Sequence, residues 1–313
     1  MTIGLVCAGP QAGRAALAAL SAVERVATGA IGGFAAFAAI DGQGCLHRAD
    51  TQRGGNATLF LAGETTGAPP PEPVADAPLA GLISSGPERP EPLSQFLAAE
   101  AGVGIVSGHR LPNAPGADGR PHNLAVLAVM GEGTAPEAAV AARLAANPEA
   151  DVGLIAADRA GRLHAANSTR VARRPDLGAA RLDRERASVA VLHNALGPGP
   201  CLAALAAETA MAVMAPAVPD GAITVAAGTP VALGPAAAVE IDGEGRATRI
   251  LTTDPGLLAP RANGAALYLG AEVRREGRLL GHLAEEPNCE IAAGRIVSMS
   301  GQALLAVGYR RER

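Results

Sequence analysis

The sequence predicts an α+β protein with a layered αββα-like arrangement, internal duplication and a β-rich C-terminal segment. Three observations predict it: a hairpin motif that occurs twice, helix-like stretches between the copies, and a change of texture after residue 216, where short Val-, Ile- and Thr-rich runs alternate with Gly-containing turns. We therefore expect an αββα-like domain with two related hairpin units over residues 1–215. Residues 216–313 are expected to form a β-rich C-terminal domain or an extension of the first.

The repeated motif reads D-x-x-G-x-L-H-x-A-[DN]-[TS]-x-R. It begins at Asp41 and again at Asp158, and an apolar run precedes each copy. An apolar run, a D-x-x-G turn and a second short run are typical of a β-hairpin, because Asp caps its own backbone and Gly tolerates positive φ. We expect a hairpin at both places.

Beyond each turn, side chains alternate between the two faces of the strand. One face of the first copy then carries His47, Thr51 and Arg53. Arg offers a forked donor for a carboxylate or phosphate, and a hydroxyl adds a further donor. The alternative is that these are strand-end residues that form intramolecular salt bridges, and the sequence leaves both interpretations open. The equivalent face of the second copy carries His164, Ser168 and Arg170.

The sequence predicts four longer helices and one short helix. The longer ones cover residues 10–26, 123–130, 134–146 and 200–214, and the short one covers residues 92–101. The third begins with a T-x-x-E pattern at Thr134, which is typical of a capping box. Their high Ala content favours helix.

Composition excludes several classes of function. All 26 basic residues are Arg, so Schiff-base and Walker-A lysine mechanisms are excluded. A net charge of −4 and only 2% aromatic residues argue against nucleic-acid binding. No acidic cluster or metal-binding motif is present, so no metal and no cofactor are predicted. The four cysteines form no C-x-x-C pair: Cys7, Cys45, Cys201 and Cys289.

The N-terminus contains a candidate nucleophile. An initiator Met is commonly removed before a small residue, and its removal would give Thr2 a free α-amine. An N-terminal Thr can use its own amine as the general base. The alternative is a first strand that simply begins with a β-forming residue.

Residues 107–113, S-G-H-R-L-P-N, form a second polar cluster where a strand ends and a loop begins, which is a usual position for binding residues. The serine lacks the G-x-S-x-G elbow of hydrolases. We expect His109, Arg110 and Asn113 to position a substrate, with a capped turn as the alternative. The pair at 193–194 is a weaker example of the same kind.

Both copies of the motif resemble the hairpin of the N-terminal-nucleophile hydrolases, especially the isoaspartyl peptidase/asparaginase family, which reads T-V-G-A-V-A-L-D-x-x-G-N-L-A-A-A-T-S-T-G-G. The family's nucleophilic Thr aligns with Phe34 in one copy and Asp151 in the other, and only Thr2-Ile3-Gly4 is similar to T-V-G. The matching residues are Asp41, Gly44, Leu46, Ala49, Thr51, Gly54 and Gly55, and Asp151–Asp158, Gly161, Leu163, Ala165, Ala166 and Ser168.

Residues 101–170 also resemble a bacterial family of uncharacterised proteins of the same hydrolase type, with a G-V-G strand, two helices and a V-G-x-x-x-x-D hairpin. Over most of its length the chain looks like a member of a bacterial domain-of-unknown-function family. The resemblance implies an N-terminal-nucleophile-hydrolase-like fold.

The sequence and the resemblance together predict an amide-bond hydrolase for a small anionic, amide-containing metabolite, acting on non-peptide or isopeptide C–N bonds. The alternatives are a non-catalytic small-molecule-binding or scaffold protein, and an interaction partner in a larger assembly. We expect a cytoplasmic protein without nucleic-acid or membrane partners, and a homo-oligomer is left open. Thr2 is the candidate nucleophile, and the candidate substrate-binding residues are Thr51, Arg53, Gly54, Gly55, Ser107, His109, Arg110, Asn113, Asn167, Ser168 and Arg170.

Overall fold

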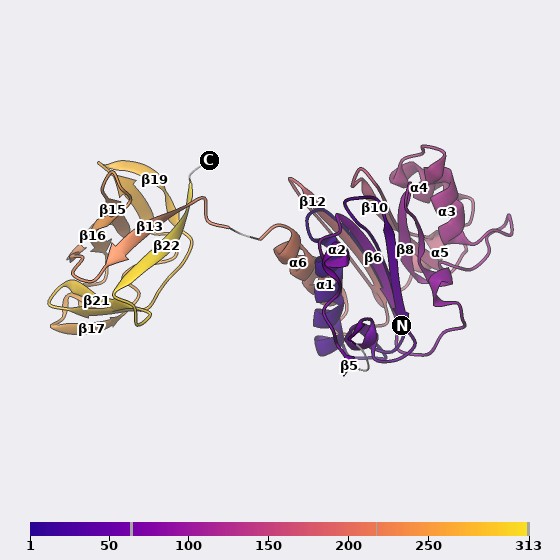
Figure 1. The fold of residues 1–313 in the computed structure, drawn as a ribbon, viewed down its shortest axis with the longest axis horizontal. Coiled ribbons are helices and arrows are strands. Elements are labelled where there is room, and N and C mark those ends of the chain that lie inside the picture. Colours follow the sequence, from indigo (N-terminus) through magenta and orange to yellow (C-terminus); the bar gives the residue numbers. More distant parts are fainter. Residues whose placement is uncertain (63–64, 217, 312–313) are drawn as a thin grey trace. The chain divides into compact units, whose positions relative to one another are not determined.

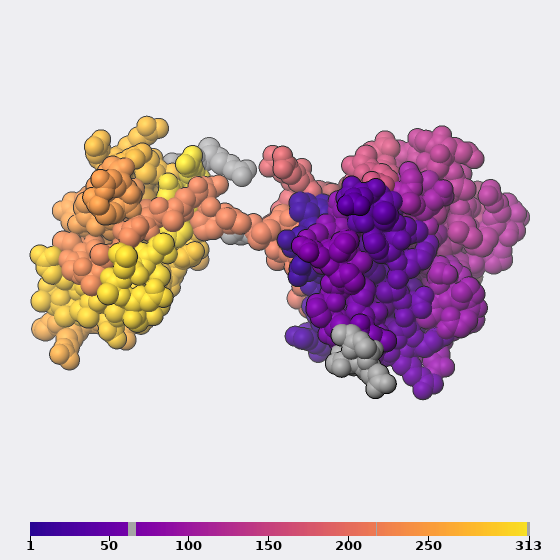
Figure 2. Space-filling model, in the orientation of Figure 1, coloured from indigo at the N-terminus to yellow at the C-terminus, as the bar shows by residue number. Residues whose placement is uncertain are grey.

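The computed structural model describes residues 1–62, 65–216 and 218–311. The chain divides into two compact units, Met1–Pro216 and Ala217–Arg313 (Figure 1). Figure 2 draws both in space-filling form. Each unit has hydrophobic core residues of its own, so each is a packing unit in its own right.

A six-stranded antiparallel sheet forms the centre of the first unit, in the order β11-β12-β1-β6-β2-β3. Every residue of its inner strand β1 (Thr2–Ala8) is buried, because both faces of the strand are covered. The other strands are β2 (Ala35–Ile40), β3 (Leu46–Thr51), β6 (Leu79–Ser84), β11 (Leu177–Arg184) and β12 (Ala187–Asn194).

The two faces of β1 face different neighbours, because successive side chains alternate. Ile3, Leu5 and Cys7 belong to a core shared with helices α1 (Ala12–Val26) and α6 (Pro200–Met214). Val6 and Ala8 belong to a second core, shared with another sheet. Even-numbered residues of β1, Thr2 among them, therefore point into the space between two sheets.

The second sheet has four antiparallel strands in the order β10-β9-β8-β7. Ile105 and Ile155 pack in the core shared with the first sheet, and Val106 and Leu154 pack with α3 (His122–Gly131) and α4 (Pro136–Ala145). The strands are β7 (Ala98–Glu100), β8 (Gly104–Arg110), β9 (Val152–Asp158) and β10 (Leu163–Asn167).

Shorter elements connect these layers. The prediction of a short helix over residues 92–101 is wrong, because a 3-10 helix ends at Phe96 and a strand follows at Ala98–Glu100. The predicted capping box of the third helix is wrong, because the N-cap of α4 is Ala135 and no side chain caps it; Pro136 instead begins the helix. The short elements are η1 (Gly55–Thr58), β4 (Leu61–Ala62), β5 (Thr65–Thr66), α2 (Glu72–Ala75), η2 (Leu93–Phe96) and α5 (Thr169–Ala172).

The second unit consists of β-strands and one short 3-10 helix, η3 (Pro255–Leu258), within its described residues. A seven-stranded sheet has the order β13-β22-β19-β18-β15-β16-β14, and a three-stranded sheet has the order β17-β20-β21. The strands are β13 (Gly221–Ala226), β14 (Val231–Leu233), β15 (Ala238–Ile241), β16 (Ala247–Thr252), β17 (Arg261–Gly264), β18 (Glu272–Arg275), β19 (Arg278–Leu283), β20 (Cys289–Ala292), β21 (Arg295–Met299) and β22 (Leu304–Arg311).

The predicted fold class, an α+β layered αββα-like protein with internal duplication, is wrong. Strands make up 40% of the chain and helices 23%, in several antiparallel sheets and a half-barrel, which is not the layered αββα fold of the N-terminal-nucleophile hydrolases. The two hairpins belong to different sheets, of six and four strands, so those sheets are not two copies of one unit. The motif misled because it specifies a turn and says nothing about the sheet that the hairpin joins.

The helices of the described chain are short. The longest, α1 and α6, have 15 residues each. In the part of the chain that the structure describes, no helix combines the length and the apolar character needed to cross a membrane.

Glycines allow neighbouring strands of the first unit to come close together. A methyl group added to Gly4 of β1 would overlap the carbonyl group of Gly108 of β8, which belongs to the other sheet. One added to Gly153 of β9 would overlap the side chains of His109 and Asn167 on the two neighbouring strands of the same sheet. Only hydrogen fits at these positions. The glycines therefore set how near the ends of β1, β8 and β10 come to one another.

We predict that Gly4→Ala lowers the free energy of unfolding by about 3 kcal/mol or more, because a side chain there must push two sheets apart. Urea unfolding measures this. The control is Gly102→Ala, where an added methyl group meets no atom within 4 Å, and we expect a change within about 0.5 kcal/mol. Equal stability of the two variants would contradict the role given to Gly4.

Candidate functional site

The Asp of the repeated motif stabilises the hairpin turn through hydrogen bonds. In both copies one oxygen of the Asp carboxylate accepts two backbone N–H groups: Asp41 Oδ1 from Gln43 and Cys45, at 2.9 and 2.8 Å, and Asp158 Oδ1 from residues 160 and 162, at 3.0 Å each. The other oxygen bonds a nearby side chain: His47 Nε2 at 2.8 Å in the first copy and Arg162 Nε at 2.6 Å in the second.

The same hydrogen-bonding pattern occurs a third time, at Asp242 in the second unit. Its Oδ1 accepts the N–H groups of Glu244 and Arg246 at 2.9 Å each, and its Oδ2 accepts Nε of Arg246 at 3.0 Å. Carboxylates that satisfy turn N–H groups in this way are a common feature of local backbone structure. The Asp–Gly part of the motif therefore stabilises hairpins and carries no chemistry of its own.

The polar residues after the first hairpin bond among themselves. Arg53 is exposed and pairs with Glu88, with its Nε 2.7 Å from Oε1. The hydroxyl of Thr51 donates to the carbonyl oxygen of Arg53 at 2.8 Å. Gly54 and Gly55 have φ of 90° and 53°, in the left-handed region that glycine adopts readily. These contacts turn the chain into η1.

The polar residues after the second hairpin have different partners. Ser168 is the N-cap of α5: its Oγ accepts the N–H of Val171 at 3.1 Å and donates to the carbonyl oxygen of Ala150 at 2.6 Å. Arg170 donates to the carbonyl oxygen of Glu149 at 3.4 Å. Among the described residues, the contacts of Arg53 and Arg170 have no residue in common.

One residue of the second hairpin reaches the space between the sheets. Asn167, at the end of β10, accepts a hydrogen bond from His109 of β8, with Nε2 and Oδ1 2.7 Å apart. The other ring nitrogen of His109 lies 3.4 Å from Oδ1 of Asn194, the last residue of β12. Asn194 is the cross-strand partner of Thr2 in β1. Four strand ends from two sheets thus meet at one place, which we call the strand-end site: Thr2, His109, Asn167 and Asn194.

Three of the four residues of the strand-end site are buried, and Asn167 is half-buried. Relative exposure is 4% for Thr2, 0% for His109 and 1% for Asn194. Cross-strand partners in an antiparallel pair project to the same face of the sheet. The side chains of Thr2 and Asn194 therefore both point toward the second sheet, where His109 lies.

His109 is neutral at pH 7. Burial is the main reason that its pKa is lowered to about 4; the hydrogen bonds to Asn167 and Asn194 oppose the shift. A neutral imidazole has one N–H, and the short contact assigns it to Nε2, which donates to Asn167. Nδ1 is then an acceptor, so the amide of Asn194 must turn its NH2 group toward it. The result is a chain of neutral hydrogen bonds that fixes Asn194 beside Thr2.

Positive charge surrounds the N-terminal amine at this end of β1. Burial lowers the pKa of the Met1 amine most, and Arg110, Arg89 and Arg174 lower it further, while Asp176 raises it. Arg110 and Arg174 each have a bidentate carboxylate partner: Nε and Nη2 of Arg110 lie 2.7 and 2.5 Å from Asp151, and those of Arg174 lie 2.9 and 2.6 Å from Asp176.

Arg89 is the exception. Its half-buried guanidinium makes no hydrogen bond or ion pair with any residue that the structure describes. Its backbone is fixed by the Gln52 side chain, which accepts the Arg89 N–H at 2.9 Å and donates to the Arg89 carbonyl oxygen at 2.6 Å. A guanidinium without a carboxylate partner among the described residues, on a backbone that is fixed in place, favours the binding of an anion.

Two other predicted site residues have structural partners. Ser107 is fully buried and donates to the carbonyl oxygen of Leu82 at 2.6 Å, which links the two sheets. Asn113 donates to Oε1 of Gln95 at 2.8 Å, and its own Oδ1 is buried without a partner among the described residues.

Sequence reasoning missed part of the site. It ranked Asn194 as a weak candidate together with His193, whose ring instead contacts the carbonyl oxygen of Gly199 at 3.1 Å. It overlooked Arg89, Arg174 and Asp176. The position of Asn194 at the end of a strand was the one sequence feature that could have identified it as a site residue. Arg89 lies in a Pro- and Glu-rich stretch, and no feature of the sequence there indicates a site residue.

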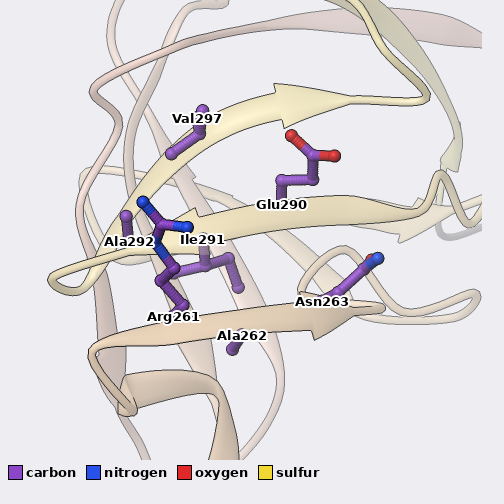
Figure 3. A pocket seen from close by; sticks show the side chains of 7 residues that line it. All are labelled: Arg261, Ala262, Asn263, Glu290, Ile291, Ala292 and Val297. Carbon is purple, nitrogen blue, oxygen red and sulfur yellow. The ribbon is translucent and has the colours of Figure 1, made fainter.

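The hollow in Figure 3 lies in the second unit and contains none of these residues. It has a volume of about 460 Å³, and its polar lining is Arg261 and Asn263 of β17 and Glu290 of β20 (Figure 3). Oε2 of Glu290 accepts a hydrogen bond from Ser298 at 2.9 Å. We give the strand-end site more weight, because its polar groups are buried and converge.

No three His, Cys, Asp or Glu side chains come close enough to hold a metal ion within residues 1–62, 65–216 and 218–311. The four cysteines are free thiols; Cys7 and Cys289 are buried, and burial raises the pKa of both thiols. A thiol with a raised pKa is a poor nucleophile at neutral pH. Neither buried cysteine therefore competes with Thr2 as a candidate.

Comparison with protein families gives two matches. Residues 2–222 match the model of the family described as "Domain of unknown function (DUF6963)". The chain belongs to this family. Residues 228–304 match "Domain of unknown function (DUF7259)", and a search of the curated proteins finds no match. The strand-end site lies wholly within the DUF6963 part.

We predict that His109 makes folding pH-dependent. Its pKa is lower in the folded state (about 4) than the ordinary value of 6.5, so the unfolded chain binds more protons between these values. His109 therefore contributes to the free energy of unfolding fully above pH 6.5. This contribution, at most about 3 kcal/mol, is lost as the pH falls toward 4. Urea unfolding at pH 7 and pH 4.5 should show a smaller loss in His109→Gln than in the wild type. An equal loss in both would contradict a neutral His109.

Proposed function

We propose that this member of the DUF6963 family is an amide-bond hydrolase that acts on a small, anionic, amide-containing metabolite, with Thr2 as the nucleophile. The single observation that carries the proposal is the surroundings of Thr2: buried neutral donors on one side and an uncompensated guanidinium near the amine. The reaction requires a free α-amine on Thr2, and so the removal of Met1.

The free amine of Thr2 is the general base. Thr2 is 4% exposed and Met1 41%, so an amine on Thr2 is more deeply buried than the Met1 amine. Burial and nearby guanidinium groups both disfavour the ammonium form, as they do at Met1. A neutral amine at pH 7 is what the reaction needs, because only that form accepts the hydroxyl proton.

The proposed chemistry balances in two steps. The Oγ of Thr2 forms a bond to the amide carbon as its proton passes to the α-amine; the C–N bond then breaks, and the same proton goes to the leaving amine. This leaves an ester on Thr2. Water, deprotonated by the α-amine, attacks the ester carbon. The ester C–O bond then breaks, the proton passes from the α-ammonium to Oγ of Thr2, and the carboxylic acid is released.

Asn194 is the proposed donor to the developing oxyanion. With its amide turned so that the NH2 group, rather than Oδ1, lies toward Nδ1 of His109, one N–H donates to the ring and the second remains for the substrate's carbonyl oxygen. His109 and Asn167 are positioning residues, because they fix that amide without touching the substrate. Arg89 is proposed to bind the substrate's anionic group.

The likeness of the hairpins to the isoaspartyl peptidase/asparaginase family contributes little to this proposal. It concerns D-x-x-G turns, and the turn at Asp242 has the same hydrogen bonds although the His and Arg of the motif do not follow it. The αββα fold of that hydrolase class is not part of the proposal. The expected cytoplasmic location remains part of it.

A specific observation favours the alternative, a non-catalytic small-molecule-binding protein. Met1 lies over this end of β1, where its Sδ accepts the N–H of Ala30 at 3.1 Å. If Met1 is retained, the nitrogen of Thr2 stays in a peptide bond and has no base function. The cation and the buried amides then serve binding alone.

The nucleophile is tested by intact-mass spectrometry of the native protein with and without a small carboxylate-bearing β-lactone. We expect a chain that begins at Thr2 and gains one lactone mass, because Thr2 opens the ring and forms an ester. Thr2→Ser should still form the adduct and Thr2→Ala should not. Retained Met1, or an adduct of equal yield in Thr2→Ala, would overturn the hydrolase proposal.

The anion contact is tested with Arg89→Gln. We expect the rate of adduct formation to fall about tenfold or more at low lactone concentration, since a charge-assisted contact contributes about 1.5–3 kcal/mol. The rate at saturation should change little. Arg120→Gln, an exposed arginine in the loop before α3, is the matched control and should react like the wild type. Equal rates for Arg89→Gln and the control would remove Arg89 from the site.

A further inference from the structure

A second hollow lies in the first unit, between α1, η1 and the Pro-rich segment that follows β5. Its volume is about 480 Å³, within the range of small-molecule sites. We call it the α1 hollow. It is lined by Leu17, Ser21, Glu24 and Arg25 of α1, by Asn56 and Ala57 of η1 with Phe60, and by residues 67–70.

Most of the lining is apolar. Leu17 is buried, Phe60 is half-buried, and Pro69 and Pro70 form another part of the wall. Phe60 is held edge-on against Phe37, with ring centroids 6.0 Å apart. The aromatic side chain and the prolines have little freedom to lose, so this wall is preformed for an apolar group.

Four polar side chains interrupt this lining: Ser21, Glu24, Arg25 and Asn56. Both carboxylate oxygens of Glu24 receive the N–H of Asn56, at 3.1 and 3.2 Å, and Glu24 has no cationic partner among the described residues. The hydroxyl of Ser21 and the side-chain amide of Asn56 make no hydrogen bond to any residue that the structure describes. A carboxylate in an apolar hollow without a counter-charge is costly.

We propose that the α1 hollow binds a primary ammonium group carried on a short apolar chain. An ammonium group has three N–H donors, and the hollow offers three kinds of acceptor: the Glu24 carboxylate, the Asn56 carbonyl oxygen and the Ser21 hydroxyl. The positive charge supplies the counter-charge that Glu24 lacks. The apolar chain packs on Phe60 and the prolines.

The charges around the hollow restrict the ligand further. Arg25 is exposed and is the only other charged residue in the described lining; η1 and residues 67–70 contribute no charged side chain. A second cation on the ligand would meet Arg25 and be repelled. Monoamines are therefore favoured over diamines.

The structural alternative is that Glu24 only fastens α1 to η1. A methyl group on Gly55 would overlap its carboxylate, so the two elements are in close contact there. Fastening needs an acceptor for the Asn56 N–H and no charge, because the carbonyl oxygen of a Gln accepts the same bond. Ammonium binding does need the charge, so Glu24→Gln separates the two roles.

Binding is measured by NMR titration of the full-length protein with n-butylamine, in an amine-free buffer at pH 8. We expect saturable shifts at residues of the α1 hollow with a dissociation constant of about 1–10 mM. n-Butanol, of the same shape without charge, should bind at least tenfold more weakly. Glu24→Gln should weaken butylamine at least tenfold without loss of folded protein, and Glu208→Gln, an exposed acid on α6, should bind like the wild type.

The pH dependence gives a second readout. Burial raises the pKa of Glu24 to about 7, against a hydrogen bond from Asn56 that lowers it. Because the amine stays protonated, its affinity should rise about tenfold from pH 6 to pH 8 and stay flat in Glu24→Gln. Equal affinity of Glu24→Gln and wild type, equal binding of butanol and butylamine, or no saturable shift by about 50 mM would overturn the proposal.

Discussion

The contact between the backbones of Gly4 and Gly108 sets the geometry on which the strand-end site depends. Neither residue has a side chain, so β1 and β8 approach at backbone distance. Thr2 lies two residues before this contact, and His109 directly follows it. A side chain at either glycine would move Thr2 and Asn194 away from His109. The amide of Asn194 and the imidazole of His109 would then lose hydrogen-bond partners.

Two electrostatic environments lie within a few residues of each other. The interior of the site is neutral, because burial keeps His109 uncharged and the asparagines carry no charge. The rim is cationic, and two of its three arginines are compensated by aspartates. A neutral interior preserves the strength of hydrogen bonds, and the cationic rim attracts anions over a longer range.

Local features such as hairpins and helices were predictable from the sequence. Which strand ends meet in the folded chain was not. The hairpins at Asp41 and Asp158 formed as predicted, because their turns depend on contacts within six residues. The helix at 200–214 followed equally from its spacing and composition. The meeting of Thr2 with Asn194 depends instead on the strand order β12-β1-β6, which brings together residues far apart in the chain. No sequence pattern indicated Arg89. It was singled out only because, in the structure, no carboxylate among the described residues pairs with its guanidinium.

A chain without lysine has its one amino group at its N-terminus, whichever residue stands there. In this protein that group is partly buried at the end of β1 and surrounded by arginines. Amine-selective acylating reagents would therefore attach at one position, with no background from lysine side chains. A single fluorophore or isotope label placed in this way would report directly on the strand-end site, and its reactivity toward such reagents would measure how much of the amine is uncharged.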